Sequence, residues 1–268
     1  MFSLEDKIII VTGGMGQLGS NFVKSLVKIK AKVVILDSNI DDEKVKEKFS
    51  GIDFENQLLI LKCDITSKDS IKESLTIIED HWGSPFGLVN NAALDSPPNS
   101  DASENGPFEE FSEESWDEVM RVNSKGVFLL SQVIGGAMAR CERGSIINIS
   151  SIYGVVSPNQ NIYDFRRKDG EVFYKPVAYS ASKSSLLNLT RYLATYWGNK
   201  GVRVNNLVLG GVFNSQSQEF LDAYSKHVPI GRMAYEDEYN GAIIFLLSDA
   251  SSYMTGSTMT IDGGWTAW

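Results

Sequence analysis

Residues 7–29 read KIIIVTGGMGQLGSNFVKSLVKI, and the architecture of the whole chain can be worked out from this segment. Lys7 to Val11 is a short β-branched run of the kind that forms a buried strand in a parallel sheet. It ends in a glycine-rich loop, TGGMGQLG, at residues 12–19. After the loop, apolar residues recur at roughly helical spacing from Phe22 to Ile29. The segment therefore predicts a strand, a glycine loop and a helix, in that order.

This order is the context that a dinucleotide-binding loop requires. Glycines let the backbone turn tightly and approach a pyrophosphate, and the helix N-terminus offers free N–H groups to that anion. The alternative is a tight strand-to-helix turn that binds nothing. We expect contacts with a nucleotide cofactor at five positions: Gly13, Gly16, Gln17, Leu18 and Gly19.

Asp37 directly follows the second strand pattern, at residues 32–36. An acid at this place can hydrogen-bond both hydroxyls of an adenosine ribose, and it would repel a 2′-phosphate. No arginine stands beside it in the sequence. The residue therefore favours NAD over NADP, with a solvated turn aspartate as the alternative.

The rest of the chain alternates strand and helix patterns, with no internal repeat and no break in composition. Further strands are predicted at 58–61, 87–89, 145–149, 202–207 and 259–261. Further helices are predicted at 40–50, 67–82, 116–141, 178–200, 216–226 and 235–248. Two polar segments, near 94–115 and 152–177, interrupt the pattern. The alternation predicts one α/β domain over residues 1–268, a single doubly wound parallel sheet with helices on both faces.

Several polar or small residues follow predicted strands. The glycine loop, Asp37, Asn90, Ser151 and Gly210 all follow strands. Because ligands of such sheets bind beyond the carboxyl ends of the strands, these residues predict a binding site along one edge of the sheet.

Tyr179 and Lys183 lie four residues apart at the start of the predicted 178–200 helix, so their side chains share one face. A free tyrosine has a pKa near ~10, and a neighbouring ammonium lowers it. The pair could therefore exchange a proton near neutral pH. The alternative is an amphipathic helix that carries both residues by coincidence.

The composition restricts partners and compartment. The chain has 268 residues and a net charge of -9, which argues against nucleic acid and against an anionic membrane surface as partners. Cys63 and Cys141 have no metal or redox spacing, and no metal site is predicted. No signal peptide and no membrane-spanning apolar run is seen, so we expect a cytoplasmic protein.

The chain resembles the short-chain dehydrogenase/reductase family over essentially its whole length. The matching segments occur in the family's order: the 12–19 loop, Asp64, NNAA at 90–93, Asn123, Ser151, YSASK at 179–183 and DGG at 262–264. The resemblance implies a Rossmann fold, a nicotinamide cofactor and a small-molecule substrate. It implies a catalytic group of Ser151, Tyr179 and Lys183, supported by Asn123. It also implies cofactor contacts at Asp64, Ile65, Asn91, Ala92, Ala93, Tyr179, Lys183, Gly210 and Val212.

In the mechanism that this resemblance implies, Tyr179 exchanges a proton with the substrate oxygen and Ser151 holds that oxygen. Lys183 lowers the pKa of Tyr179 and holds the nicotinamide ribose, and Asn123 carries a water for proton relay. A hydride passes between the nicotinamide and a secondary alcohol or ketone. Members of the family are usually tetramers, so we expect a homo-oligomer, either a tetramer or a dimer.

The chain departs from the family pattern at several positions. Gln17 stands where compact members commonly have glycine, and the glycine spacing matches the longer, sugar-nucleotide-modifying branch. That branch carries a C-terminal substrate domain, which this chain has no residues left to build. Ala93 replaces a glycine, and Leu209 replaces the proline usually found before Gly210.

Ser151 and Tyr179 are 28 positions apart, more than relatives usually show, so residues 152–177 are interpreted as an insertion over the mouth of the site. The insertion is aromatic and basic in an acidic protein, and its aromatic residues could stack on a sugar ring. The alternatives are a solvated loop and a loop packed on a neighbouring subunit. Its cations could clamp a phosphate or carboxylate: Arg166, Arg167, Lys168 and Lys175.

Both polar segments and the C-terminal WTAW make the chain similar to dehydrogenases linked to bacterial flagellin and surface-sugar modification. The leading hypothesis is therefore an NAD-dependent dehydrogenase acting on a sugar or sugar derivative. One alternative is an epimerase or dehydratase that uses NAD without net turnover, favoured by the glycine spacing and opposed by the missing substrate domain. The other is a nucleotide-binding protein that has lost catalysis, which the intact Ser151, Tyr179 and Lys183 set opposes.

Overall fold

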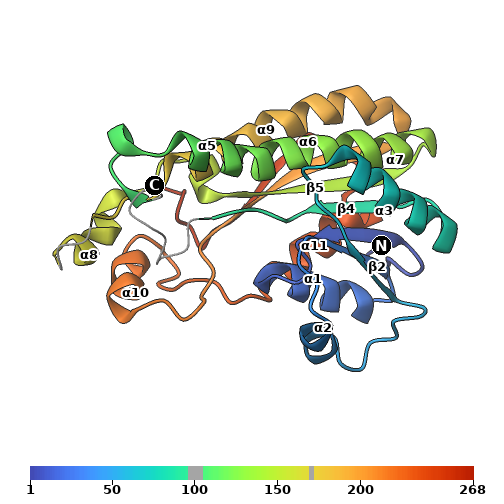
Figure 1. Cartoon of the computed structure of the whole chain (residues 1–268), viewed down its shortest axis with the longest axis horizontal. Coiled ribbons are helices and arrows are strands. Elements are labelled where there is room, and N and C mark those ends of the chain that lie inside the picture. Colours follow the sequence, from blue (N-terminus) through green and yellow to red (C-terminus); the bar gives the residue numbers. More distant parts are fainter. Residues whose placement is uncertain (96–104, 169–171) are drawn as a thin grey trace.

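A seven-stranded parallel sheet forms the centre of the computed structural model, which describes residues 1–95, 105–168 and 172–268 (Figure 1). The strand order is β3-β2-β1-β4-β5-β6-β7, with the reversal between β1 and β4. This is the predicted doubly wound sheet, and the fold prediction is confirmed. The strands are β1 (Ile8–Thr12), β2 (Lys32–Asp37), β3 (Leu58–Lys62), β4 (Gly87–Asn90), β5 (Gly144–Ser151), β6 (Val202–Leu209) and β7 (Thr258–Ile261).

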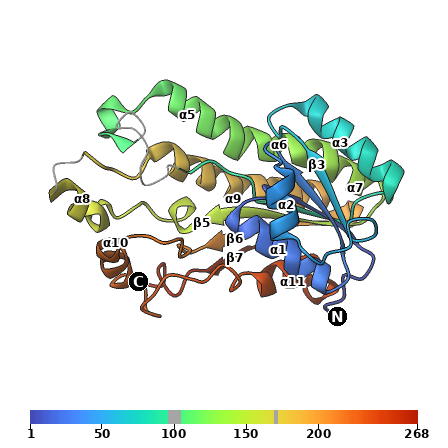
Figure 2. The same cartoon turned by 60° about the horizontal axis from the view of Figure 1, so that its bottom comes forward.

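Helices cover both faces of the sheet because successive strand side chains point to opposite sides. Along β1, Ile9 and Val11 join one core cluster, whereas Ile8 and Ile10 join the other. The first cluster packs under α1 (Gln17–Lys28), α2 (Asp42–Lys48) and α11 (Asn240–Leu247). The second packs under α3 (Lys68–His81), the helical segment 113–140 and α9 (Val177–Trp197). Figures 1 and 2 show these two helical layers.

The helical segment 113–140 is continuous but not uniformly α-helical. It comprises α5 (Glu113–Met120), α6 (Val127–Leu130) and α7 (Gly136–Arg140), joined by π-helical turns at Arg121–Gly126 and Ser131–Gly135. Turns of this kind occur frequently near functional sites. The first of them contains Asn123, so the distortion falls at a residue that the sequence already singles out.

The polar segments contain more regular structure than their composition predicts. The helix expected from 116 begins at Glu113, because the Ser112 side chain caps it by accepting from the Ser115 N–H. The prediction for 94–115 otherwise falls partly on 96–104, outside the described residues. The 152–177 insertion holds 3₁₀ turns at Ile152–Gly154 and Gln160–Tyr163, followed by α8 (Asp164–Lys168).

The insertion packs against the segment that follows β6. Tyr163 of the insertion contacts Phe220 of α10 (Gln218–Ser225), with ring centroids 5.7 Å apart. Both belong to or pack on a third apolar cluster that also contains Phe173, Tyr224 and Trp265. In Figures 1 and 2, α8 and α10 accordingly lie at the same end of the molecule. None of the helices in the described part of the chain is both long and apolar enough to cross a membrane.

Candidate active site

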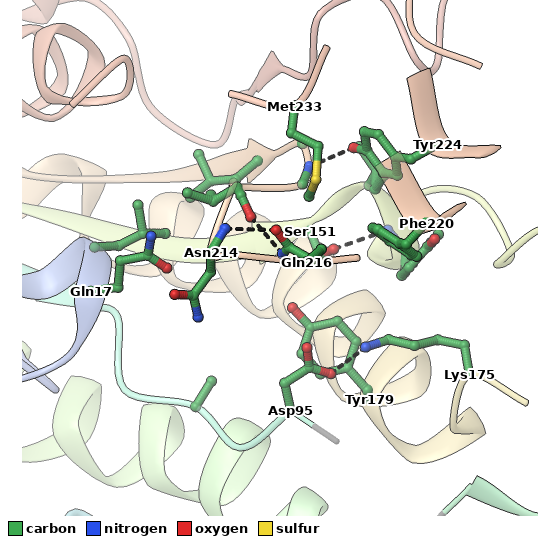
Figure 3. Close-up of a pocket in the computed structure, with 18 of the residues that line it drawn as sticks. Gln17, Asp95, Ser151, Lys175, Tyr179, Asn214, Gln216, Phe220, Tyr224 and Met233 are labelled. Atoms are coloured by element: carbon green, nitrogen blue, oxygen red, sulfur yellow. Dashed lines mark hydrogen bonds and ion pairs between the residues drawn. The ribbon is translucent and has the colours of Figure 1, made fainter. Parts of the chain in front are cut away.

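A cavity of about 930 Å³ lies at the carboxyl ends of the strands (Figure 3). Its walls come from the start of α1, the ends of β4, β5 and β6, the start of α9, the 152–177 insertion and residues 214–217 before α10. Ser151, Tyr179 and Lys183 all line it. Three residues from two segments of the sequence therefore line the same cavity, in the grouping that the family resemblance implies.

Tyr179 and Lys183 lie one turn apart on α9, as their spacing predicts. The Lys183 Nζ atom lies 5.8 Å from the centroid of the Tyr179 ring. The lysine is 4% exposed, and its Nζ donates a hydrogen bond to the Ile149 carbonyl at 2.9 Å. Burial lowers the pKa of Lys183 to about 8, and the Asp95 carboxylate partly opposes that shift.

The expected lowering of the Tyr179 pKa is not what this environment produces. Burial raises the pKa of Tyr179 above its usual value, and the nearby Asp95 carboxylate raises it further. A hydrogen bond with Ser151 acts in the opposite direction. The physical reason is that Lys183 directs its ammonium at the Ile149 carbonyl, whereas the Asp95 carboxylate lies near the tyrosine.

Of the two adjacent serines, Ser151 has the geometry that suits a catalytic hydroxyl. Neighbouring side chains of a strand point to opposite faces. Ser150 Oγ donates to the Lys183 carbonyl at 2.9 Å, so it joins β5 to α9. Ser151 Oγ accepts the Tyr153 N–H at 3.2 Å and hydrogen-bonds with Tyr179. The structure thus places Ser151, rather than Ser150, toward Tyr179.

Asn123 is buried, and it is not one of the described residues that line the cavity. Its Oδ1 accepts the Leu94 N–H at 2.8 Å, and its Nδ2 donates to the Leu94 carbonyl at 2.9 Å and to Ser182 Oγ at 3.0 Å. The side chain therefore ties the segment after β4 to α9, just beside Lys183.

The glycine loop has the close backbone contacts that a pyrophosphate cradle needs. Gly13 adopts φ +64°, and a Cβ on Gly19 would lie 2.2 Å from the Gly13 carbonyl oxygen. The α1 helix has no side-chain cap among the described residues and no acid in its first turn, whereas Asp41 caps α2. Its N-terminal amides are thus left to an anion, and the loop fits a dinucleotide phosphate.

Two acids predicted to contact the cofactor lie at the ends of their strands. Asp37 accepts the Met15 N–H at 3.0 Å and the Asn39 N–H at 3.1 Å, so it is fixed beside the glycine loop. Asp64 accepts from the Thr66 hydroxyl at 2.7 Å and the Thr66 N–H at 2.8 Å, and these bonds hold its pKa below the usual range. Ile65 is buried against the position of Gly126.

The segment after β4, residues 91–93, packs against the glycine loop and hydrogen-bonds to its first residue, Thr12. The Asn91 Nδ2 donates to the Thr12 carbonyl at 2.9 Å, and the Asn91 and Ala92 N–H groups each donate to Thr12 Oγ1 at 3.0 Å. Ala92 also lies against Gly13, where an added Cβ would come within 2.9 Å of its Cα. Asn91 and Ala93 reach the cavity wall.

The loop after β6 closes the opposite side. Gly210 and Val212 line the cavity, and the Gly211 N–H donates to the Tyr224 hydroxyl at 2.7 Å. Gln17 and Leu18, at the start of α1, also line the cavity. The Gln17 Nε2 donates a hydrogen bond to the Phe213 carbonyl at 2.8 Å. The family departure at Gln17 therefore links the glycine loop to this second loop, a contact that the sequence did not predict.

The cations of the insertion differ in their surroundings. Arg166 lines the cavity, with its guanidinium carbon 4.0 Å from the centroid of the Phe173 ring. Arg167 does not appear among the described lining residues, because its guanidinium pairs with Asp164 and donates to backbone carbonyls of the insertion. The structure therefore gives Arg167 no place in a substrate clamp. The Lys168 side chain lies outside the described part.

Lys175 lines the cavity but is paired. Its Nζ lies 2.5 Å from Asp95 Oδ1 and 4.9 Å from the centroid of the Tyr179 ring. Asp95 was missed by the sequence analysis, although it lies only a few residues beyond Asn91 at the same sheet edge. Its position shortly after the carboxyl end of β4 is the signal that could have identified it.

Models of known families match the chain in two consecutive parts. The model described as short chain dehydrogenase matches residues 7–164. The model described as enoyl-(acyl carrier protein) reductase matches residues 168–266.

Individual relatives match nearly the whole chain. The post-translational flagellin modification protein A of Campylobacter coli is 30% identical, over 98% of this chain and 99% of its own. A short chain dehydrogenase of Leptospira borgpetersenii, solved with bound NAD+, has a TM-score of 0.84 at 33% identity and covers 98% of this chain and 94% of that one. A gluconate 5-dehydrogenase of Burkholderia cenocepacia, in complex with NADP and tartrate, has a TM-score of 0.84 at 26% identity, covering 100% and 98%. The chain therefore belongs to the short-chain dehydrogenase/reductase family of oxidoreductases.

Proposed function

We propose that the protein is an NAD-dependent oxidoreductase that transfers a hydride between the nicotinamide and a secondary alcohol or ketone of a sugar or sugar derivative. The observation that carries this proposal is the meeting of Ser151, Tyr179 and Lys183 on one wall of the 930 Å³ cavity. The glycine loop opens onto the same cavity through Gln17 and Leu18.

In the direction of reduction, the protonated Tyr179 donates its proton to the substrate carbonyl oxygen, while Ser151 donates a hydrogen bond to the same oxygen. Oxidation is the reverse step and requires the Tyr179 phenolate, which takes the proton of the substrate hydroxyl. Lys183 keeps two further N–H donors besides the one bound to Ile149, and these are available for a cofactor ribose. When bound, the nicotinamide supplies the hydride acceptor, or the donor in the reverse direction. Asn123 positions the segment after β4; the water relay expected of it stays a prediction.

The residues that would hold the cofactor are the N-terminal amides of α1, with Gly13, Gly16 and Gly19 keeping the loop close. Asp37 supports a preference for NAD, because a carboxylate at the end of β2 accepts ribose hydroxyls and repels a 2′-phosphate. The related structures contain either NAD+ or NADP, so the preference rests on Asp37 itself. Asp64, Ile65, Asn91, Ala92, Ala93, Gly210 and Val212 complete the proposed cofactor contacts.

A sugar-like substrate is supported by the cavity and by the relatives. Its aromatic side, which includes Tyr153, Tyr163 and Phe173, suits the apolar face of a sugar ring, and Ser151 and Lys175 provide polar contacts. One matched structure is named a gluconate 5-dehydrogenase, and one relative is named for flagellin modification. A place in surface-glycan or flagellin modification is the corresponding proposal for the pathway.

The test is a screen of polyols, sugars, sugar acids and sugar phosphates for reduction of NAD+ at 340 nm, repeated with NADP+. We expect steady formation of NADH with at least one hydroxylated substrate, and slower turnover with NADP+. Conversion of a sugar nucleotide without net NADH would instead support the epimerase or dehydratase alternative. Tight binding of NAD+ with no turnover of any compound would support the catalytically silent alternative.

A further inference from the structure

An ion pair lies inside the cavity, next to the tyrosine assigned to catalysis. Lys175 of the insertion and Asp95 of the segment after β4 come together 80 positions apart in sequence, with Nζ and Oδ1 separated by 2.5 Å. Figure 3 shows the two side chains meeting beside the Tyr179 ring. All three residues line the cavity. The pair is therefore close to any substrate whose reacting oxygen contacts the Tyr179 hydroxyl.

The backbone of Lys175 is held in place by one other residue of the insertion. The Lys175 N–H donates to Gln160 Oε1 at 2.8 Å, and its carbonyl accepts from Gln160 Nε2 at 3.2 Å. Its ammonium lies over the face of Tyr179, with Nζ 4.9 Å from the ring centroid. The lysine is thus positioned before any substrate binds, which is what a recognition element requires.

The two charges are not equally accessible. The Lys175 side chain is 10% exposed and the Asp95 side chain 54% exposed. One carboxylate oxygen of Asp95 is bound to Lys175, and the second has no partner among the described residues. Asp95 is the more exposed of the two, so a substrate meets its carboxylate before the ammonium of Lys175, which is already paired.

A carboxylate oxygen accepts hydrogen bonds and cannot donate them when ionised. It attracts a hydroxyl and repels a carboxylate or phosphate. Figure 3 shows Asp95 beside Tyr179, so the hydroxyl that fits this oxygen is one on a carbon close to the reacting carbon. Arg166, another cation that lines the cavity, lies over the Phe173 ring rather than beside Tyr179.

Resting on the proposed function, we propose that Asp95 and Lys175 form a subsite for the hydroxyl next to the reacting carbon. The enzyme accordingly takes neutral vicinal diols, such as polyols and unphosphorylated sugars, in preference to sugar acids and sugar phosphates. This replaces the expected clamp for a phosphate or carboxylate at Lys175.

The first measurement compares substrates that differ by one group. Values of kcat/KM are measured for butane-2,3-diol against butan-2-ol, and for sorbitol against sorbitol 6-phosphate and gluconate. We expect kcat/KM to be at least about tenfold higher for the diol than for the mono-alcohol, and for sorbitol than for either anion. A factor of this size is what one hydrogen bond to a charged group contributes. Preference for either anion, or equal values for diol and mono-alcohol, would overturn the proposal.

The second measurement assigns the preference to the pair. Asp95→Asn keeps the shape of the side chain and removes its charge, so the ratio of diol to mono-alcohol kcat/KM should fall about tenfold. Lys175→Met, whose backbone stays bracketed by Gln160, should lower the same ratio. Asp69→Asn is the matched control, because Asp69 pairs with Lys72 at 3.1 Å on the exposed surface of α3. The control should keep the wild-type ratio.

The Kd for NAD+ in each variant reports an intact fold, and we expect wild-type values. If both cavity variants keep the wild-type ratio, the subsite is wrong. If the wild-type protein reduces NAD+ with none of these compounds, the proposed function fails for this substrate class. In that case the subsite is still tested by binding of threitol to the enzyme–NADH complex, followed by NADH fluorescence. Binding that Asp95→Asn weakens supports the subsite, and undiminished or absent binding contradicts it.

Discussion

Replacing Lys183 by methionine is expected to stabilise the folded protein while it stops turnover. The lysine is 4% exposed, and burial lowers its pKa to about 8 from a value of 10.5. Each unit of pKa corresponds to about 1.4 kcal/mol, so holding the charged lysine in the fold at pH 7 costs about 3 kcal/mol. The lost hydrogen bond to Ile149 offsets about 1 kcal/mol of this, and a net gain of about 2 kcal/mol remains.

The pH dependence distinguishes this cause from better packing. Because the pKa of Lys183 is lower in the folded protein, the unfolded chain binds more protons between pH 8 and 10.5. The stability of the wild type should therefore rise with pH in that window, and the cost should be full below it. The advantage of Lys183→Met should be largest at pH 7 and should shrink as pH 10.5 is approached.

The assay is urea unfolding of both proteins at equal protein concentration, at pH 7, 8, 9 and 10, with NADH formation measured in parallel. A higher urea midpoint for the variant at pH 7, converging with the wild type at high pH, is expected. A variant that is less stable than the wild type at pH 7, or a gap that does not change with pH, would show that the buried charge of Lys183 is not the cause.

Three further predictions concern the site. Ser151→Ala should lower kcat by about a hundredfold or more. Ser150→Ala should mainly lower the free energy of unfolding, by about 1 kcal/mol, because Ser150 joins β5 to α9. Steady-state kinetics measures the first effect and thermal unfolding the second. Asp37→Asn should raise the KM for NAD+ about tenfold and reduce the preference over NADP+, measured as the ratio of kcat/KM for the two cofactors. Gly19→Ala should abolish NAD+ binding and lower the free energy of unfolding by about 1–3 kcal/mol, because its Cβ would lie 2.2 Å from the Gly13 carbonyl oxygen. Gly241→Ala is the control, because its Cβ would meet open space and should change neither property. Calorimetric titration with NAD+ checks both variants.

The sheet could be predicted from the sequence because each strand is a short apolar run followed by a turn or a polar residue. The β-branched runs of β1 and β2 and the glycine loop between them are local patterns, and the carboxyl-edge rule then places distant residues together. This rule places Ser151 at the edge of the site, whereas its grouping with Tyr179 followed from the family resemblance. That the whole chain is one domain, that it is a homo-oligomer and that it is cytoplasmic all stay predictions.

The features that could not be predicted depend on contacts between distant segments. The pairing of Asp95 with Lys175, and of Gln17 with the Phe213 carbonyl, requires loops whose paths have no periodic signal. The direction of the Tyr179 pKa was wrong for the same reason, because spacing reveals a nearby ammonium but not the degree of burial. Arg167 shows a similar limit, since a basic residue in a loop can hold that loop together rather than face a ligand.

The central claim is that Tyr179 exchanges the proton while the rest of the site binds the cofactor. It is tested most directly by Tyr179→Phe, which removes one oxygen atom and keeps the ring that packs against Lys175. We measure NADH formation with the best polyol substrate and the Kd for NAD+ in the same preparation. We expect turnover to fall by at least about a thousandfold, with a Kd within about threefold of the wild-type value. Turnover near the wild-type rate would contradict the assignment of Tyr179 and the mechanism built on it.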